Sequence, residues 1–241
     1  MKRLFSLFIG LVSCAAMAET IYLTSLSWPP YADKNLVNQG ASVAVAKAAF
    51  AAEGHELVVN FYPWSRTVKL AQQSNSKYMG YFPEYYFETQ GFLFSDAMGS
   101  GPLGIMQNTA KPIAFSKVQD LRGMRIGIVQ DYVNTQTLDV MIASGEVQGE
   151  AVPSDVLNIK KVAVKRLDAA VIDANVLTFL LGSDPSLAQL KHRVEMHPIL
   201  LQDKKLYIAF KNTPEGKRWR AIFNAGLQKI DVNGIMQQHL K

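Results

Sequence analysis

The stretch Arg166-Leu-Asp-Ala-Ala-Val-Ile-Asp173 has the composition of a short buried strand that ends on an acid. Its nearly continuous apolar run is typical of a parallel strand covered on both faces. Ligands of open α/β sheets bind outside the carboxyl ends of the strands, so Asp173 is expected to face whatever the protein holds. Asp173 is equally expected to cap a helix over residues 174 to 181, because Asp is a favoured N-cap residue. The two roles are compatible.

The whole chain has the composition of an ordinary globular protein, with 241 residues of which 49% are hydrophobic. Its formal net charge of +5 is too small to indicate a nucleic-acid partner. No metal site or other cofactor is expected, because the histidines show no metal-ligand spacing. These histidines are His55, His192, His197 and His239.

Residues 1–18 have the pattern of a secretory signal peptide. Lys2 and Arg3 precede an apolar stretch, and the small-residue site Ala16-Met-Ala18 stands before Glu19. The apolar stretch is too short to span a bilayer, which needs about 20 residues. We therefore expect an exported, soluble protein of the periplasm.

The single cysteine, Cys14, lies within this signal. Leu11-Val-Ser-Cys14 resembles a lipobox, which would make Cys14 a lipidated N-terminus. A strand-like segment begins at Thr20, however, and leaves no flexible tether after the signal. Free secretion is the preferred prediction and an anchor at Cys14 is the alternative.

After the signal, predicted strands and helices alternate in two blocks separated by the turn-rich run Gly99-Ser-Gly-Pro-Leu-Gly104. This order favours parallel sheets with right-handed crossovers in two lobes. The predicted strands are residues 20–25, 56–61, 77–82, 124–129, 150–152 and 206–210. The predicted helices are residues 41–53, 65–73, 134–143 and 154–166, with a last helix from Thr213 whose apolar stripe faces the core.

Several local motifs, in this order, resemble the bacterial family 3 solute-binding proteins, the periplasmic receptors of polar amino acid uptake systems. The resemblance covers the chain after the signal. Its elements are Trp28-Pro-Pro-Tyr31, Phe94-Ser-Asp96, Leu121-Arg-Gly-Met-Arg-Ile-Gly127, the stretch from Arg166 to Asp173, and Tyr207-Ile-Ala-Phe210 with the helix around Phe223-Asn-Ala-Gly-Leu227.

The resemblance implies an α/β, two-lobe periplasmic-binding-protein-like fold of type II with two hinge crossings. Lobe 1 is expected over residues 19–103, lobe 2 over 104–206, and the return to lobe 1 over 207–241. The crossings are expected near 100–106 and 206–210. Ligand would bind in the interlobe cleft, and hinge closure would present it to an ABC transporter permease or a membrane sensor. The family default is a monomer.

Some site residues follow from matching positions in the family. Asp173 matches the acid that receives the ammonium group of the ligand, and Tyr31 matches an aromatic residue that lies over it. Trp28 either contacts the ligand or plugs the end of the sheet.

Pro63-Trp-Ser-Arg66, which includes Trp64, recurs in a subgroup of the family. Arg66 is expected in the first helical turn, where the helix dipole disfavours a cation by roughly 0.3–1 kcal/mol. It therefore needs a partner, either a ligand carboxylate or a neighbouring acid such as Glu84.

The chain departs from the family at Glu88, where typical receptors carry the arginine that clamps the ligand carboxylate. Glu88 is either exposed or part of the cleft, and Glu84, Tyr85 and Tyr86 are candidates for the cleft. Tyr132 lies in Gln130-Asp-Tyr-Val-Asn134, where relatives have a turn that leads into a helix N-terminus.

These features predict a binding protein without catalysis. Its ligand is expected to be a small polar molecule that bears an amine or another cation, or an amino acid derivative whose carboxylate is bound by Arg66. One alternative is a periplasmic enzyme of the cyclohexadienyl dehydratase type, in which Glu84 or Glu88 transfers a proton. Another is the ligand-sensing partner of a membrane receptor.

Export and cleavage are testable by intact-mass measurement of the protein recovered from cells. We expect a mature chain that starts at Glu19. A diacylglyceryl-modified Cys14 at the N-terminus would contradict free secretion.

Overall fold

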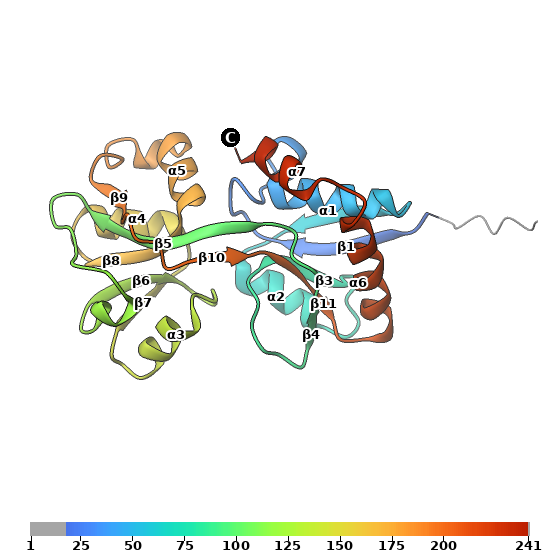
Figure 1. Cartoon of the computed structure of the whole chain (residues 1–241), viewed down its shortest axis with the longest axis horizontal. Helices are drawn as coiled ribbons and strands as arrows, with labels where there is room; N and C mark the ends of the chain where they lie inside the picture. The colour runs from blue at the N-terminus through green and yellow to red at the C-terminus, as the bar shows by residue number, and fades with distance from the viewer. Residues whose placement is uncertain (1–17, 241) are drawn as a thin grey trace, which may run out of the picture.

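The computed structural model describes residues 18–240, so the expected signal up to Met17, with Cys14, lies outside the described residues. The chain forms two α/β lobes that lie side by side along the long axis (Figure 1). Within the described part, no helix is long and apolar enough to cross a membrane. The predicted α/β, two-lobe fold is confirmed.

The first lobe contains a five-stranded sheet of order β2-β1-β3-β11-β4. Strands β2 and β3 run parallel to β1, as predicted, whereas the return strand β11 is antiparallel to β3 and β4. The strands are β1 (Thr20–Ser25), β2 (Glu56–Phe61), β3 (Gly80–Glu84), β4 (Phe92–Phe94) and β11 (Tyr207–Lys211). The helices are α1 (Ala41–Ala52), α2 (Trp64–Gln72), α6 (Pro214–Leu227) and α7 (Val232–His239).

The second lobe contains a six-stranded sheet of order β10-β5-β8-β6-β7, with β9 paired to β5. Strand β6 is parallel to β7 and β8, and β5 is antiparallel to β8. The strands are β5 (Ser100–Asn108), β6 (Arg125–Val129), β7 (Gln148–Val152), β8 (Ala169–Asp173), β9 (Val194–Met196) and β10 (Gln202–Lys205). The helices are α3 (Gln136–Ala143), α4 (Asp155–Ala163) and α5 (Ala174–Ser183).

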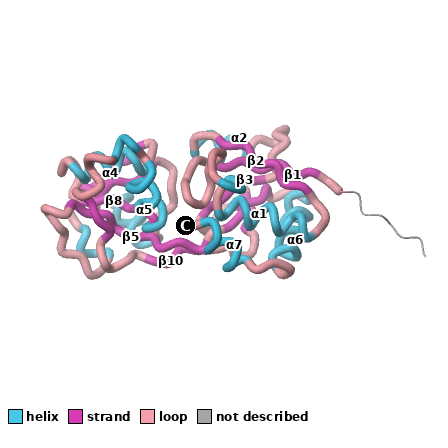
Figure 2. The backbone as a smooth tube through the Cα atoms, turned by 90° about the horizontal axis from the view of Figure 1, so that it is seen from above, coloured by secondary structure: helices cyan, strands magenta, loops and turns pink. Residues whose placement is uncertain are grey.

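Two neighbouring segments connect the lobes, as the view from above also shows (Figure 2). Strands β5 and β10 pair in antiparallel register from Gln202↔Leu103 to Lys205↔Ser100. The chain then returns through Leu206, whose amide donates to the carbonyl of Gly99 at 2.9 Å. The second connection is therefore centred on Leu206, and β11 already belongs to the first sheet.

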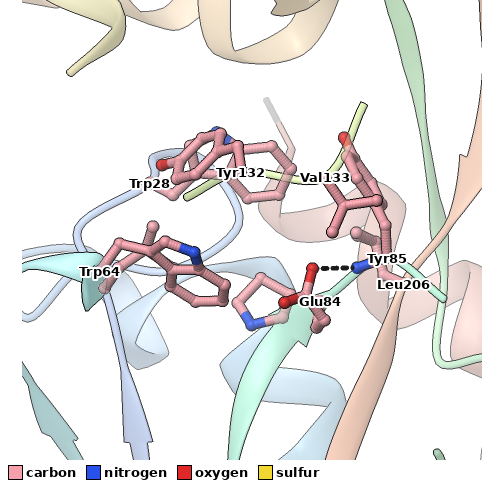
Figure 3. A pocket seen from close by; sticks show the side chains of 9 residues that line it. Trp28, Trp64, Glu84, Tyr85, Tyr132, Val133 and Leu206 are labelled. Atoms are coloured by element: carbon pink, nitrogen blue, oxygen red, sulfur yellow. Dashed lines mark hydrogen bonds between the residues drawn. The ribbon is translucent and has the colours of Figure 1, made fainter. Parts of the chain in front are cut away.

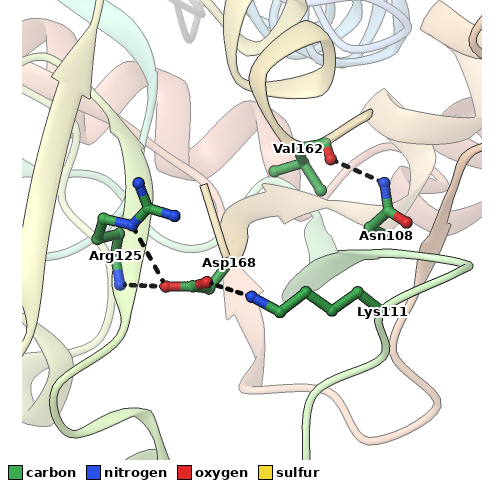
Figure 4. Close-up of polar contacts among 5 residues, drawn as sticks. All are labelled: Asn108, Lys111, Arg125, Val162 and Asp168. Carbon is green, nitrogen blue, oxygen red and sulfur yellow. Dashed lines mark hydrogen bonds and ion pairs between the residues drawn. The ribbon is translucent and has the colours of Figure 1, made fainter. Parts of the chain in front are cut away.

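The stretch that begins at Arg166 is fixed at its outer end by Asp168. This carboxylate accepts hydrogen bonds from the Arg125 amide at 2.9 Å and from Lys111 Nζ at 3.0 Å (Figure 4). Asn108 Nδ2 donates to the Val162 carbonyl at 3.0 Å and ties β5 to α4. All five residues of β8 are buried, as the apolar run predicts.

The C-terminal helix α6 packs on α1 through the predicted apolar stripe. Trp219 and Phe223 are buried and contact the ring of Phe50, with centroid separations of 6.0 and 5.2 Å. Gly226 permits close contact with α1, since a Cβ at this position would lie 2.0 Å from the carbonyl oxygen of Ala49. The two helices therefore depend on a glycine at this crossing.

Gly226→Ala should lower the melting temperature by several degrees, because the added methyl group would force α6 away from α1 at a cost of about 1–3 kcal/mol. Gly182→Ala is the matched control, since a Cβ at Gly182 in α5 meets nothing within 4 Å. Thermal unfolding followed by circular dichroism measures both. Equal melting temperatures for the two variants would contradict this packing.

Candidate functional site

The candidate site is a cavity of about 620 Å³ between the two lobes. The first lobe contributes Trp28 and Trp64 to its walls, and the second contributes Tyr132, Asp155 and Val176. Its volume lies within the range of roughly 300–1,000 Å³ that is usual for small-molecule sites. The cavity can therefore accept a small ligand from both lobes at once.

A smaller inner cavity of about 30 Å³ lies next to it. Trp28, Trp64 and Tyr132 line both cavities, and Glu84 and Tyr85 line only the inner one (Figure 3). A space of this size holds one or two water molecules at most, since one water needs about 10–15 Å³ on this measure. A larger group reaches Glu84 only if the surrounding rings move.

Aromatic rings form much of the cleft wall. Trp28 stacks on Tyr31 with ring centroids 4.5 Å apart and meets Tyr85 edge-on at 6.1 Å. Trp64 meets Tyr132 edge-on at 5.8 Å across the lobes. The electron-rich faces of such rings attract cations and planar groups.

Asp173 has the capping role considered from the sequence, and it lines neither cavity. Its Oδ1 caps α5 by accepting from the amides of Asn175 at 2.8 Å and Val176 at 3.1 Å. Its Oδ2 accepts from the hydroxyl of Tyr31 in the other lobe at 3.1 Å, and Asn175 Nδ2 donates to that hydroxyl at 2.8 Å. Burial raises the pKa of Asp173 to about 7, against the lowering effect of these hydrogen bonds.

A second set of contacts joins the lobes at the edge of the cleft. Trp64 Nε1 donates to the Asp131 carbonyl at 2.9 Å, and the Ser65 hydroxyl donates to the Asp131 carboxylate. Asp131 has a φ of 63°, an uncommon left-handed conformation for a residue with a side chain. The side chain of Asp131 is thus engaged with the first lobe.

Two further acids are buried in the cleft. Burial raises the pKa of Glu84 to about 8, and its Oε1 accepts from the Tyr85 amide at 2.7 Å. Asp155, the first residue of α4, is 8% exposed. Burial and the neighbouring charge of Asp173 raise the pKa of Asp155 to about 7.

The sequence prediction did not include Asp155. Its signal was available, because Asp155 starts α4 shortly after the end of β7, and Asp173 ends β8 just before α5. Both acids stand at the carboxyl end of a strand and the start of a helix, which is the position that the crevice rule selects.

The basic residues lie differently from the expectation. Arg66 is exposed on α2, with its guanidinium 5.1 Å from the centroid of the Tyr62 ring, and lines neither cavity. Glu88, at the position of the family clamp, is exposed. Lys204 on β10 donates to the Asn134 carbonyl at 2.8 Å and lies 4.7 Å from the centroid of the Tyr85 ring. Burial lowers the pKa of Lys204.

Among residues 18–240, no group of three or more His, Cys, Asp or Glu side chains is placed to hold a metal ion. The acids of the cleft come instead with aromatic rings and helix N-termini.

Comparison with known proteins found no matching family model and no matching curated protein. Solved structures match over nearly the whole chain. The ligand-binding core of GluR0 from Nostoc punctiforme, in complex with L-glutamate, has 22% identity and a TM-score of 0.69 over 91% of this chain and 96% of that chain.

Two further structures extend this likeness. A histidine kinase sensor domain with similarity to periplasmic binding proteins has 15% identity and a TM-score of 0.75 over 91% of this chain and 93% of that chain. An amino acid ABC transporter substrate-binding protein from Streptococcus pneumoniae, bound to L-arginine, has 13% identity and a TM-score of 0.69, over 92% of this chain and 94% of that chain. The protein thus has the two-lobe fold of periplasmic binding proteins.

Glu84→Gln should stabilise the protein increasingly as the pH rises. The pKa of Glu84 is raised from 4.5 to about 8 on folding, so the buried carboxyl favours the folded state only while it is protonated. The destabilising effect of the ionised carboxylate grows as the pH rises from 4.5 to about 8. The substituted glutamine keeps an oxygen that can accept a hydrogen bond from the Tyr85 amide.

The measurement is the melting temperature of variant and wild type at about pH 5 and about pH 9. We expect a small difference at the lower pH and a gain of several degrees for Glu84→Gln at the higher pH. Glu88→Gln, at an exposed position, should show no such trend. A constant difference at both pH values would contradict the burial of a titrating Glu84.

Proposed function

We propose that this protein is an exported solute-binding protein of the family 3 type, which captures a small organic cation in its interlobe cleft and presents it to a membrane transporter. One observation carries the proposal: buried acids and aromatic rings line the cleft, whereas among residues 18–240 no arginine lines the two cavities and the lysine that does, Lys34, is exposed. The proposed contacts are the walls formed by Trp28, Trp64 and Tyr132, with the acids behind them.

The electrostatics favour a positively charged ligand. A buried acid with a raised pKa is penalised for ionising, and an incoming ammonium or guanidinium group offsets that penalty. The acids at the starts of α4 and α5 both have a pKa of about 7. A cation in the cleft would therefore lower these pKa values and release protons.

A free ligand carboxylate has no buried cationic partner among the residues that line the two cavities, because Lys34, the lysine that lines the larger one, is exposed. Arg66 is exposed and lies over the ring of Tyr62, and Glu88 stands at the position of the family clamp. Lys204 is already bonded to the Asn134 carbonyl. Burial of an unpaired carboxylate is costly, so an α-amino acid held in the usual family manner is disfavoured.

The partner is proposed from the fold relatives. One comparable structure is an ABC transporter substrate-binding protein and another is a histidine kinase sensor domain. Transport is the first proposal and ligand sensing by a membrane receptor is the second. Both use the same event, in which the lobes close over the ligand.

Catalysis is a second candidate function, and the observation that favours it is the raised pKa of Glu84 beside the inner cavity. A protonated carboxyl at neutral pH can act as a general acid. The inner cavity of about 30 Å³ leaves no room for a substrate beside it, however. Turnover of prephenate or arogenate by the purified protein would overturn the assignment as a binding protein.

A thermal-shift screen of amines, guanidines, quaternary ammonium compounds and amino acids tests the ligand class. A ligand at about 100 times its dissociation constant should add roughly 2.7 kcal/mol of stability, which is a shift of several degrees. We expect cations without a carboxylate to give the largest shifts and Arg66→Ala to leave them unchanged. A shift given only by carboxylate-bearing ligands, and lost in Arg66→Ala, would contradict the proposal.

Closure is tested by small-angle scattering with the strongest compound of the screen. The structure is a closed form, because Tyr31 and Asp173 are hydrogen-bonded across the cleft. We expect saturating ligand to give a radius of gyration at or below that of the free protein. An increase on binding would contradict closure of the lobes over the ligand.

A further inference from the structure

We infer that Asp155 receives the positive charge of the ligand, whereas Asp173 holds the two lobes together through Tyr31. This assignment rests on the proposed binding of an organic cation in the cleft. The sequence had assigned the binding of the ligand's cationic group to Asp173, whereas this inference assigns it to Asp155.

Asp173 has no space for a ligand in the closed form. Both of its carboxylate oxygens accept hydrogen bonds, Oδ1 from the backbone of α5 and Oδ2 from the hydroxyl of Tyr31. The pair also packs against β5 at Gly101. A Cβ at Gly101 would lie 2.1 Å from Asp173 Oδ2 and 2.3 Å from Tyr31 Oη, so not even a methyl group fits there.

We call the hydrogen bond from Tyr31 to Asp173, together with the one from Asn175 to Tyr31, the latch, because these bonds hold the two lobes together. Tyr31 belongs to the first lobe, and Asp173 and Asn175 belong to the second, so these hydrogen bonds form only when the lobes meet. Hydrogen bonds to charged groups are stronger than those between neutral groups, and Tyr31 and Asp173 are 0% and 2% exposed. Closure is therefore favoured by contacts that the ligand need not supply.

Asp155 has the opposite surroundings. Its side chain lines the cavity of about 620 Å³ together with Trp28, Trp64 and Tyr132. It is more than nine-tenths buried, at 8% exposed. Its own backbone amide hydrogen-bonds to the carboxylate, and within residues 18–240 no other residue donates to it. It is thus a buried acceptor that faces a ligand-sized space.

A buried polar group nearby has no hydrogen-bond partner. Tyr85 is 6% exposed, and its hydroxyl makes no hydrogen bond within the described part of the chain. Burial raises the pKa of Tyr85, and the charges of Asp173, Tyr31 and Asp155 add to this effect. Buried polar groups are normally hydrogen-bonded, so the unpaired Tyr85 hydroxyl of the inner cavity and the Asp155 carboxylate, to which no other residue donates, indicate a missing ligand contact.

The chemistry of the wall narrows the ligand class to cations that donate N–H hydrogen bonds. A primary ammonium or a guanidinium can donate to Asp155 while the rings of Trp28 and Tyr132 contact its carbon atoms and its charge. A quaternary ammonium group would use only the rings. We therefore assign a protonated amine or guanidine to this site.

The test compares butylamine, butylguanidine and butyltrimethylammonium by isothermal titration calorimetry. Asp155→Asn should weaken binding of the first two probes by about 10- to 100-fold, because it removes a charge-assisted hydrogen bond. Asp155→Ser removes the same carboxylate and keeps a small polar residue at the helix start, so it should give a similar loss. Glu150→Gln, an exposed position in the same lobe, controls for the change in net charge.

Asp173→Asn should change affinity for these probes less than about threefold, since Asn still caps α5 and can still bond to Tyr31. Tyr31→Phe removes the latch hydroxyl and should increase the radius of gyration of the free protein, whereas Asp155→Asn should not. A loss in Asp173→Asn as large as that in Asp155→Asn would overturn this assignment and leave the proposed function intact. Failure of every probe to bind the wild-type protein would overturn both.

Discussion

The carboxylate of Asp173 is buried where the two lobes meet, and the surrounding structure is arranged to satisfy it. The strand β8 ends there, and the acid caps α5 by accepting from the amides of Asn175 and Val176. Tyr31 reaches it from the opposite lobe, held by its stack on Trp28. β5 passes close enough to need Gly101 at that point. The hinge strand, the helix start and the aromatic loop are thus coupled through one buried charge.

As a result, the buried ionisable side chains of the cleft are mainly acids rather than cations. Glu84, Asp155 and Asp173 are all buried, and their pKa values are raised because burial disfavours the ionised form. Each helix N-terminus partly compensates for the acid placed at it. An organic cation can relieve the remaining electrostatic penalty. The affinity of the site therefore depends on the charge of the ligand and not on buried hydrophobic area alone.

Local signals explain which parts of the candidate site were predictable. Asp173, Tyr31, Trp28 and Tyr85 stand in short motifs next to strands, and such residues reach the carboxyl edge of a sheet whatever the remainder of the fold does. Asp155 has the same local position, yet nothing in the sequence places the end of β7 opposite the aromatic loop. Arg66 was assigned a possible ligand role that stays a prediction, and it is exposed on α2 over the ring of Tyr62, which lines the larger cavity.

The sequence by itself determined the alternation of strands and helices, the buried β8, the cap on α5 and the apolar face of α6. These features depend on periodicity and on contacts between residues close in the chain. Only the tertiary structure decided that β11 joins the first sheet antiparallel to β3, that Tyr31 donates a hydrogen bond to Asp173, and that Asp155 lines the larger cavity. Each of these depends on how two separately folded lobes meet, with partners such as Tyr31 and Asp173 separated by 142 positions. No local pattern encodes such a distance.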